Sequence, residues 1–120
     1  MNLVDKYCSD CFPELVEIFG LDALEEASGF GSYIFHEDYF VKWMKGAVLT
    51  PSIIERITKY MEYLAESPNS HLNDLAHVGL LESVVDVDLV ELAPYMGAET
   101  KKLLVKVCST MHLDPDIWLV

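Results

Sequence analysis

The feature that most constrains the fold is a helical period that runs through nearly the whole chain. Its clearest example is residues 51–66, where apolar side chains recur every three or four positions, at Ile53, Ile57, Tyr60, Met61 and Leu64. Thr50 and Pro51 precede this pattern as an N-cap and a first helical residue, and Ser67-Pro68 follows it. A helix over residues 51–66 is therefore predicted, with one buried face.

The same period predicts helices along the rest of the chain, over residues 2–12, 13–24, 36–45, 70–86, 88–95 and 98–112, with a possible last turn after Pro115. The first of these places a common apolar stripe at Leu3, Val4, Tyr7, Cys8, Cys11 and Phe12. Gly29 and Gly31 predict a loop over residues 27–32. Only "VVDVDLV" alternates in the manner of a strand. We therefore predict an all-α fold: a compact bundle of about six to seven helices, mostly antiparallel neighbours, without significant sheet.

Length and composition predict one domain over residues 1–120 with a real core, because 52% of its 120 residues are hydrophobic. No run of 18 apolar residues occurs, so no membrane span is expected. The N-terminus lacks the basic and apolar regions of a signal peptide, and the cysteine count of three is odd. These features favour the cytoplasm and reduced thiols.

The distribution of charge says more than the formal net charge of −12. Residues 1–38 contain nine acids and one base, Lys6, while residues 62–99 contain eight acids and no base. Phosphate binding needs positive charge, so direct binding of nucleic acid or of an anionic membrane is not expected. A basic protein is the partner that this charge favours, although acidic surfaces also serve solubility.

Aromatic side chains are concentrated in "GFGSYIFHEDYFVKWMKG". Most of them are expected in the core, because aromatic residues dominate burial. Phe30 and Tyr33 lie beside the glycines and are candidate exposed anchors. The acids Glu25, Glu26, Glu37 and Asp38 surround them in the sequence. Aromatic anchors with complementary charge are typical of protein interfaces.

His71, Asp74 and His77 recur every third residue and suggest a metal or acid–base site. Zinc ligands on one helix usually lie four residues apart, whereas the two histidines here lie six apart and point away from each other. The surrounding residues are apolar nearly all round the helix, which is typical of a buried central helix. We therefore interpret Asp74 and His77 as polar groups at a helix edge.

The cysteines offer an alternative, because Cys8 and Cys11 near one end and Cys108 and His112 near the other have the spacing of zinc ligands. All three cysteines, however, fall on the apolar stripes of their helices, where free cysteine acts as a small hydrophobe. No phosphate-binding glycine loop and no nucleophile motif occurs. No cofactor and no enzymatic activity are expected, and a zinc-binding regulatory or adaptor domain is the alternative hypothesis.

Three stretches together resemble a known family: "CFPELVEIFG", "RITKYMEYLAESPNSHLNDLAHVGLLESV" and "YMGAETKKLLVKV". Their order is similar to that of the small helical immunity proteins that accompany bacterial contact-dependent growth inhibition toxins. The resemblance implies a non-enzymatic cytoplasmic protein that binds and blocks the toxin domain of a neighbouring cell. Many such toxins are nucleases with basic active sites, and an RNase is favoured here.

Two acidic clusters are then candidates for the toxin-binding surface. The first comprises Glu25, Glu26, Glu37 and Asp38 with the anchors Phe30 and Tyr33, and the second comprises Asp86, Asp88 and Glu91. Carboxylates in either cluster could occupy the phosphate path of a basic cleft and steer its approach. No chemistry would be required of them.

Overall fold

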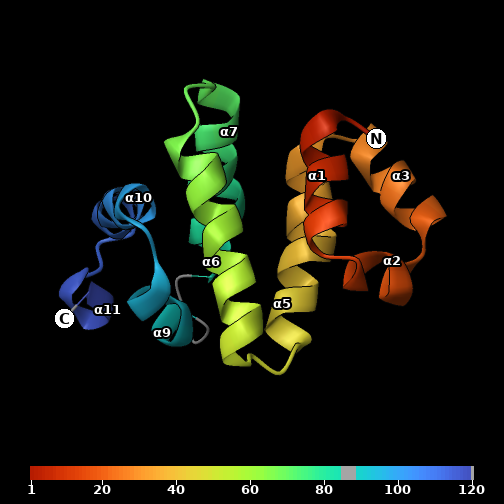
Figure 1. Cartoon of the computed structure of the whole chain (residues 1–120). Helices are drawn as coiled ribbons and strands as arrows, with labels where there is room; N and C mark the ends of the chain where they lie inside the picture. The colour runs from red at the N-terminus through yellow and green to blue at the C-terminus, as the bar shows by residue number, and fades with distance from the viewer. Residues whose placement is uncertain (85–88, 120) are drawn as a thin grey trace. The chain divides into compact units, whose positions relative to one another are not determined.

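The computed structural model of the chain describes residues 1–84 and 89–119, and all regular structure within them is helical (Figure 1). This confirms the predicted all-α class. The chain divides into two compact units, residues 1–48 and residues 49–120, and each is described by itself. The single domain expected from the length of the chain stays a prediction.

The first unit contains helical elements in the order α1 (Leu3–Cys11), α2 (Glu14–Phe19), α3 (Leu21–Gly29), α4 (Ser32–Phe35), the π-helix η1 (His36–Val41) and α5 (Lys42–Gly46). The last three follow one another without a break and form one continuous helix, so the helix predicted over residues 36–45 begins four residues earlier. Two glycines with positive φ separate the others: Gly20 at 85° lies between α2 and α3, and Gly31 at 112° lies between α3 and α4. Side chains other than glycine rarely adopt this conformation.

The predicted loop over residues 27–32 is therefore too long. Ala27, Ser28 and Gly29 continue α3, and only Phe30 and Gly31 connect it to α4. The reason is that Ala27 and Ser28 are buried and belong to the packed face of α3, so a composition typical of loops is overridden by tertiary contacts.

An aromatic cluster forms part of the core of this unit. The ring of Phe12 lies 4.8 Å from that of Phe40 and 5.4 Å from that of Trp43, measured between centroids. Phe12 and Phe40 have no exposed surface, and neither has Leu15 or Leu24. Half of the aromatic residues of the middle segment are buried, namely Phe35, Phe40 and Trp43, so the expectation that most of them form core holds only in part.

Helix α1 buries only part of the apolar stripe predicted for it: Cys8 and Phe12 are completely buried, but the stripe's other members are not. Leu3 is 88% exposed and Tyr7 is 41% exposed, whereas Asp5, Cys8 and Ser9 are buried. The physical reason lies in Asp5, because a hydrogen bond from Ser28 on α3 to Oδ2 offsets part of the cost of burying its carboxyl group, while its Oδ1 is buried without a hydrogen bond in the described structure.

The second unit contains α6 (Pro51–Glu66), α7 (Ser70–Asp74), the π-helix η2 (Leu75–Leu81), α8 (Glu82–Val84), α9 (Leu89–Leu92), the 3₁₀ turn η3 (Ala93–Tyr95), α10 (Ala98–Thr110) and α11 (Asp116–Leu119). Helix α6 has the predicted limits. The Thr50 side chain accepts a hydrogen bond from the Ile53 backbone amide at 3.3 Å, as an N-cap does. Ile57, Met61 and Leu64 are almost completely buried, which confirms the predicted face.

Helices α6 and α7 form a tight antiparallel hairpin (Figure 1). Asn73 holds it closed, because its side-chain amide donates to the backbone carbonyls of Leu64, Ala65 and Ser67 at distances of 2.8–3.1 Å. These carbonyls belong to the last turn of α6, where no intrahelical donor reaches them. Asn69 begins α7 by accepting hydrogen bonds from His71 and Leu72.

The described residues form nine continuous helical segments rather than six to seven. One extra segment arises at Gly20, which splits the helix predicted over residues 13–24. Another is α11, a single turn after Pro115. The helix predicted over residues 88–95 consists of α9 followed by η3, while residue 88 lies outside the described part of the chain.

Candidate partner-binding surface

The four acids predicted as the first toxin-binding cluster all have exposed side chains. Glu25 and Glu26 lie in the middle of α3, and Glu37 and Asp38 lie in the π-helix η1. π-Helical turns are rare and occur frequently at functional sites. The structure thus places these carboxylates on two elements of the first unit, in contact with solvent.

The two aromatic residues predicted as anchors are also exposed. Phe30 is 74% exposed and Tyr33 is 41% exposed, whereas Phe35, Phe40 and Trp43 of the same segment are buried. Phe30 follows α3 directly, and the positive φ of Gly31 turns the chain before α4 begins. The short connection therefore presents a large apolar side chain to solvent.

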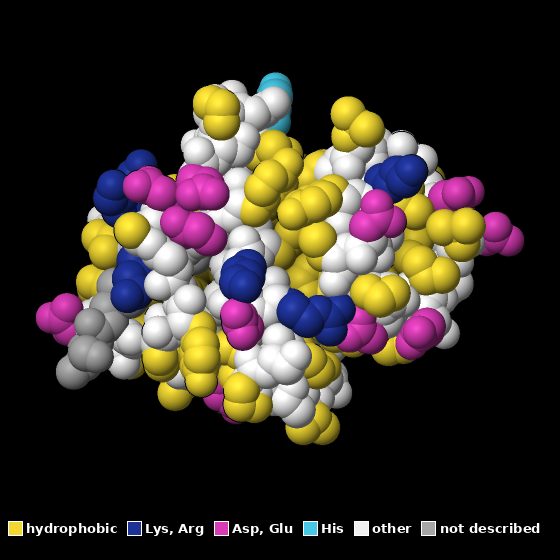
Figure 2. Space-filling view, in the orientation of Figure 1, with side chains coloured by type: hydrophobic (Ala, Val, Ile, Leu, Met, Phe, Trp, Pro, Cys, Tyr) yellow, Lys and Arg dark blue, Asp and Glu magenta, His cyan; other side chains and the backbone are white. Residues whose placement is uncertain are grey.

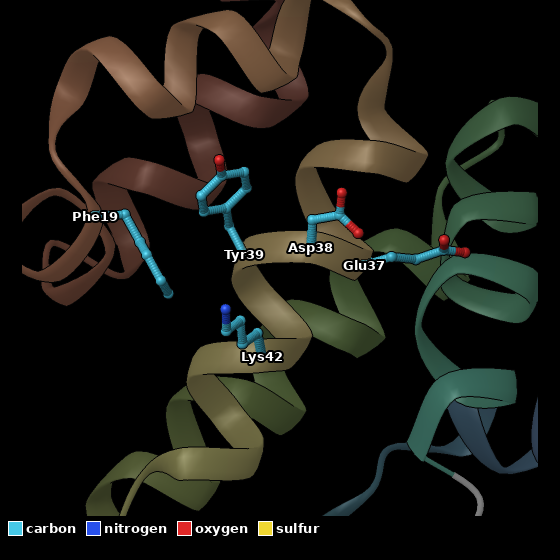
Figure 3. A pocket seen from close by; sticks show the side chains of 5 residues that line it. All are labelled: Phe19, Glu37, Asp38, Tyr39 and Lys42. Atoms are coloured by element: carbon cyan, nitrogen blue, oxygen red, sulfur yellow. The ribbon is translucent and has the colours of Figure 1, made fainter.

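Glu37 and Asp38 line an open pocket of about 430 Å³ together with Phe19, Tyr39 and Lys42 (Figure 3). The rings of Phe19 and Tyr39 meet edge to face, with centroids 5.0 Å apart and an interplanar angle of 83°. The sequence gives no sign that Phe19 lies beside Tyr39, because they are 20 residues apart and meet only when α2 packs against η1. Lys42 also brings a positive charge to this wall, so the pocket is less acidic than the sequence suggests.

On the face shown in Figure 2, acidic side chains are interspersed with exposed hydrophobic ones over both units. In the first unit the exposed large apolar residues include Leu3, Ile18, Leu21 and Phe30. A surface of mixed carboxylates and apolar side chains is compatible with a protein interface, although singly scattered apolar residues are also normal on protein surfaces.

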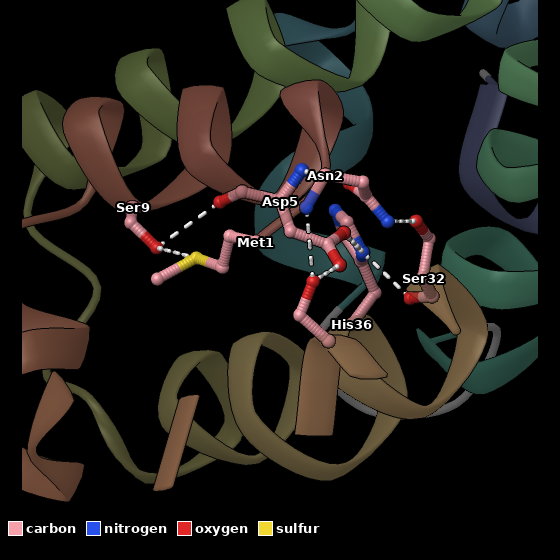
Figure 4. A network of polar contacts seen from close by, with 7 residues as sticks. Met1, Asn2, Asp5, Ser9, Ser32 and His36 are labelled. Carbon is pink, nitrogen blue, oxygen red and sulfur yellow. Dashed lines mark hydrogen bonds and ion pairs between the residues drawn. The ribbon is translucent and has the colours of Figure 1, made fainter. Parts of the chain in front are cut away.

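A buried polar network lies beside this surface, between α1, α3 and α4 (Figure 4). The Ser28 hydroxyl donates to Asp5 Oδ2 at 2.5 Å, and His36 Nδ1 lies 3.6 Å from Asp5 Oδ1. His36 Nδ1 also lies 2.8 Å from the Ser32 carbonyl oxygen, which can only accept, so this nitrogen carries a proton. Asp5 and His36 have no exposed surface. Burial lowers the pKa of His36, despite the hydrogen bond to Ser32 and the carboxyl group of Asp5, which both raise it.

This trio of serine, histidine and aspartate does not have the arrangement of a nucleophilic site. Ser28 donates its hydrogen bond to Asp5 rather than to His36, so the imidazole does not act on the hydroxyl as a base. A substrate would also have to reach groups without solvent exposure. The network instead fixes the positions of the three helices around it.

The second predicted cluster is described only in part. Asp86 and Asp88 lie outside the described residues, and Glu91 is exposed on the short helix α9. Of the predicted acids, those that the structure describes therefore lie mainly in the first unit.

The proposed zinc ligands belong to different units. Cys8 and Cys11 are on α1, where Cys8 is completely buried, while Cys108 is buried on α10 and His112 is exposed with a φ of 56°. Burial raises the pKa of the Cys108 thiol, and Asp114 adds to this, which disfavours the thiolate that binds zinc. Within residues 1–84 and 89–119, no three His, Cys, Asp or Glu side chains are grouped as metal ligands would be.

The histidines of the second unit are also far from forming a site. His71 and Asp74 are exposed on α7, and His77 is partly exposed in η2. Val78 lies four residues after Asp74 and seven after His71, on the same exposed side, and is 43% exposed, while Gly79 is buried. The helix predicted to be apolar all round therefore has one solvent face, and Asp74 lies on the exposed side.

No protein-family model matches the sequence, and no curated protein and no solved structure matches it significantly. Among the described residues, no helix combines the length and the apolar character that a membrane span needs. The described part of the chain is all-helical, and its first unit exposes acidic side chains together with Phe30 and Tyr33.

Proposed function

We propose that the chain is an immunity-type inhibitor that binds the toxin domain encoded beside its gene, a basic nuclease and in the first instance an RNase. The observation that carries the proposal is the exposed acidic and aromatic surface of the first unit. The resemblance of three sequence stretches to immunity proteins of contact-dependent growth inhibition supports it.

Electrostatics supports a basic partner. Residues 7–41 contain eight acids and neither lysine nor arginine, and seven of these acids have exposed side chains. At physiological salt the Debye length is about 8 Å, so several carboxylates spread over one unit still attract an approaching basic cleft. Such steering raises association rates by about 10- to 1000-fold over those of uncharged partners.

Inhibition then requires occupation of the cleft and no chemical step. The carboxylates would take the positions of nucleic acid phosphates, while Phe30 and its apolar neighbours would slow dissociation. The protein would act in the cytoplasm, where an incoming nuclease meets its substrate.

The decisive experiment co-expresses the toxin domain with the protein and measures growth, and then measures association of the purified pair at about 50 mM and about 500 mM salt. We expect full protection and an association rate that falls steeply with salt. Charge reversal of Glu25 and Glu26 to lysine should slow association by roughly tenfold or more. The matched control reverses two exposed bases of the other unit, Lys101 and Lys102, to glutamate and should change the rate little.

Absence of protection and of binding would refute the proposal. Binding that is insensitive to salt and to reversal of these acids would refute the electrostatic mechanism, even if protection is observed.

A further inference from the structure

Two of the most exposed apolar side chains in the first unit lie where the beginning of α1, the end of α3 and the beginning of α4 meet. Leu3 is 88% exposed and Phe30 is 74% exposed. The three helix ends converge at one end of this unit in Figure 1. Asn2 bridges the connection that carries Phe30, since its backbone amide donates to Ser28 Oγ at 3.3 Å and its side chain donates to Ser32 Oγ at 2.8 Å. Leu3 and Phe30, called the Leu3–Phe30 end below, therefore share one end of the unit.

The Leu3–Phe30 end is held in place by the buried network behind it (Figure 4). Ser28 is buried two residues before Phe30, and its hydroxyl is fixed by the carboxyl group of Asp5 at 2.5 Å. Asn2, next to Leu3, also caps α1 by accepting from the Asp5 backbone amide at 2.9 Å. A segment whose backbone is already ordered loses less conformational entropy on binding than a mobile segment does.

The charge beside this end determines what can cover it. Asp22, Glu26 and Phe30 follow one another at intervals of four residues, so they lie on one side of α3, and all three are exposed. A second copy of the chain would bring the same acids against them, which is unfavourable at a net charge of −12. A partner with basic side chains around an apolar depression would match both the exposed apolar side chains of this end and the acids beside it.

We propose that the Leu3–Phe30 end is the apolar anchor of the interface with the toxin domain, seated in an apolar depression whose rim carries lysine and arginine. The inference rests on the proposed function and adds the contact that determines how long the complex lasts. Charged residues of α3 accelerate the encounter, whereas the Leu3–Phe30 end slows dissociation.

The test measures association and dissociation of the full chain with the toxin domain encoded beside the gene. Phe30→Ser, Leu3→Ser and the double variant are compared with Ile18→Ser. Ile18 is 61% exposed on α2 of the same unit and provides a matched loss of exposed apolar surface. Truncation of an interface hot spot weakens binding by on the order of 30-fold or more, so Phe30→Ser should dissociate at least that much faster. Leu3→Ser should act in the same direction, and Ile18→Ser should stay within about twofold of the wild type.

A folding defect is not expected to affect this result, because the side chains of Leu3 and Phe30 are exposed. The thermal unfolding midpoints of the variants should match that of the wild type. If the wild-type protein binds and all three serine variants dissociate at its rate, the inference is overturned and the proposed function stands. If the wild-type protein does not bind the toxin domain, both are overturned. If the free protein is a dimer that Phe30→Ser converts to a monomer, the end serves self-association and the inference is overturned.

Discussion

Glu62 performs a structural task that a stability measurement can isolate. Its carboxylate, on α6, accepts hydrogen bonds from the Thr100 backbone amide and hydroxyl, both at 2.8 Å, and from the Glu99 amide at 3.2 Å. Gly97, at the N-cap position of α10, has no side chain to do this. A residue from another helix therefore caps the first turn of α10.

Replacing Glu62 by alanine should lower the free energy of unfolding by about 1–2 kcal/mol, the value typical of a lost N-cap, because two backbone amides lose their acceptor. For a chain of this size each kcal/mol corresponds to about 4 °C in Tm. Chemical denaturation followed by circular dichroism measures the difference. The control, Glu55→Ala on the same helix, removes only an exposed pair with Lys59 and should cost no more than about 0.5 kcal/mol.

The pH dependence gives a second measure of the same contact. Partial burial alone would raise the pKa of Glu62, but the hydrogen bonds from Thr100 and Glu99, with Lys102 nearby, lower it below its ordinary value. The stabilisation is therefore complete above the pKa of the unfolded state, about 4.5, and is lost as pH falls through the lower folded-state pKa. The difference between wild type and Glu62→Gln should shrink over this acidic range.

Gly97 provides the result that would refute this reasoning. A Cβ atom at Gly97 would lie 2.3 Å from Glu62 Cδ, so Gly97→Ala should displace the carboxylate and destabilise the wild type. In the Glu62→Ala background the collision is absent, and the same substitution should cost much less. Additive effects of the two substitutions, or a loss for Glu62→Ala equal to that of Glu55→Ala, would show that Glu62 does not cap α10.

Three further predictions concern residues that sequence analysis singled out or overlooked. Because the pKa of His36 is lowered in the folded state, stability should fall as pH decreases below about 6.5, and His36→Gln should flatten this dependence in denaturation curves measured between pH 7.5 and pH 5.5. Thermal unfolding in EDTA should match that in buffer, and Cys11→Ser should cost no more than about 1–2 kcal/mol; a stoichiometric zinc whose removal unfolds the chain would instead support the zinc hypothesis. The double variant Asp74→Ala, His77→Ala should protect against the toxin as well as the wild type, since the side chain of Asp74 is exposed and that of His77 partly so; lost protection at unchanged stability would assign chemistry to this helix.

The helices could be predicted from the sequence wherever apolar residues keep one period, and α6 is the clearest case. Its capping threonine, its limits and its buried face all agree with the structure. The π-helices η1 and η2 could not be predicted, because a single extra residue in a turn leaves the local composition unchanged while it rotates the following side chains.

The candidate surface could be predicted from the sequence only in part. Glycines beside Phe30 and Tyr33 indicated a turn, and both side chains are exposed. Leu3, in contrast, was predicted as core because its helix has an apolar stripe, and no local signal distinguishes Asp5 as the buried residue. The burial of Asp5 depends on Ser28, 23 residues away, which supplies its hydrogen bond only once α1 and α3 have packed.

The acidic residues of this chain therefore fall into two groups, those that accept hydrogen bonds from other helices and those that are exposed to solvent. Asp5 and Glu62 are held by specific donors from other helices, and their replacement should be felt as a loss of stability. Glu25, Glu26 and Asp22 are exposed on one short helix and belong to a stretch without lysine or arginine, so their mutual repulsion opposes folding slightly. Reversal of an acid of this second kind should leave the protein as stable or make it more stable, while it weakens attraction to a basic partner. That opposite response of stability and binding is what separates an interaction surface from a structural contact.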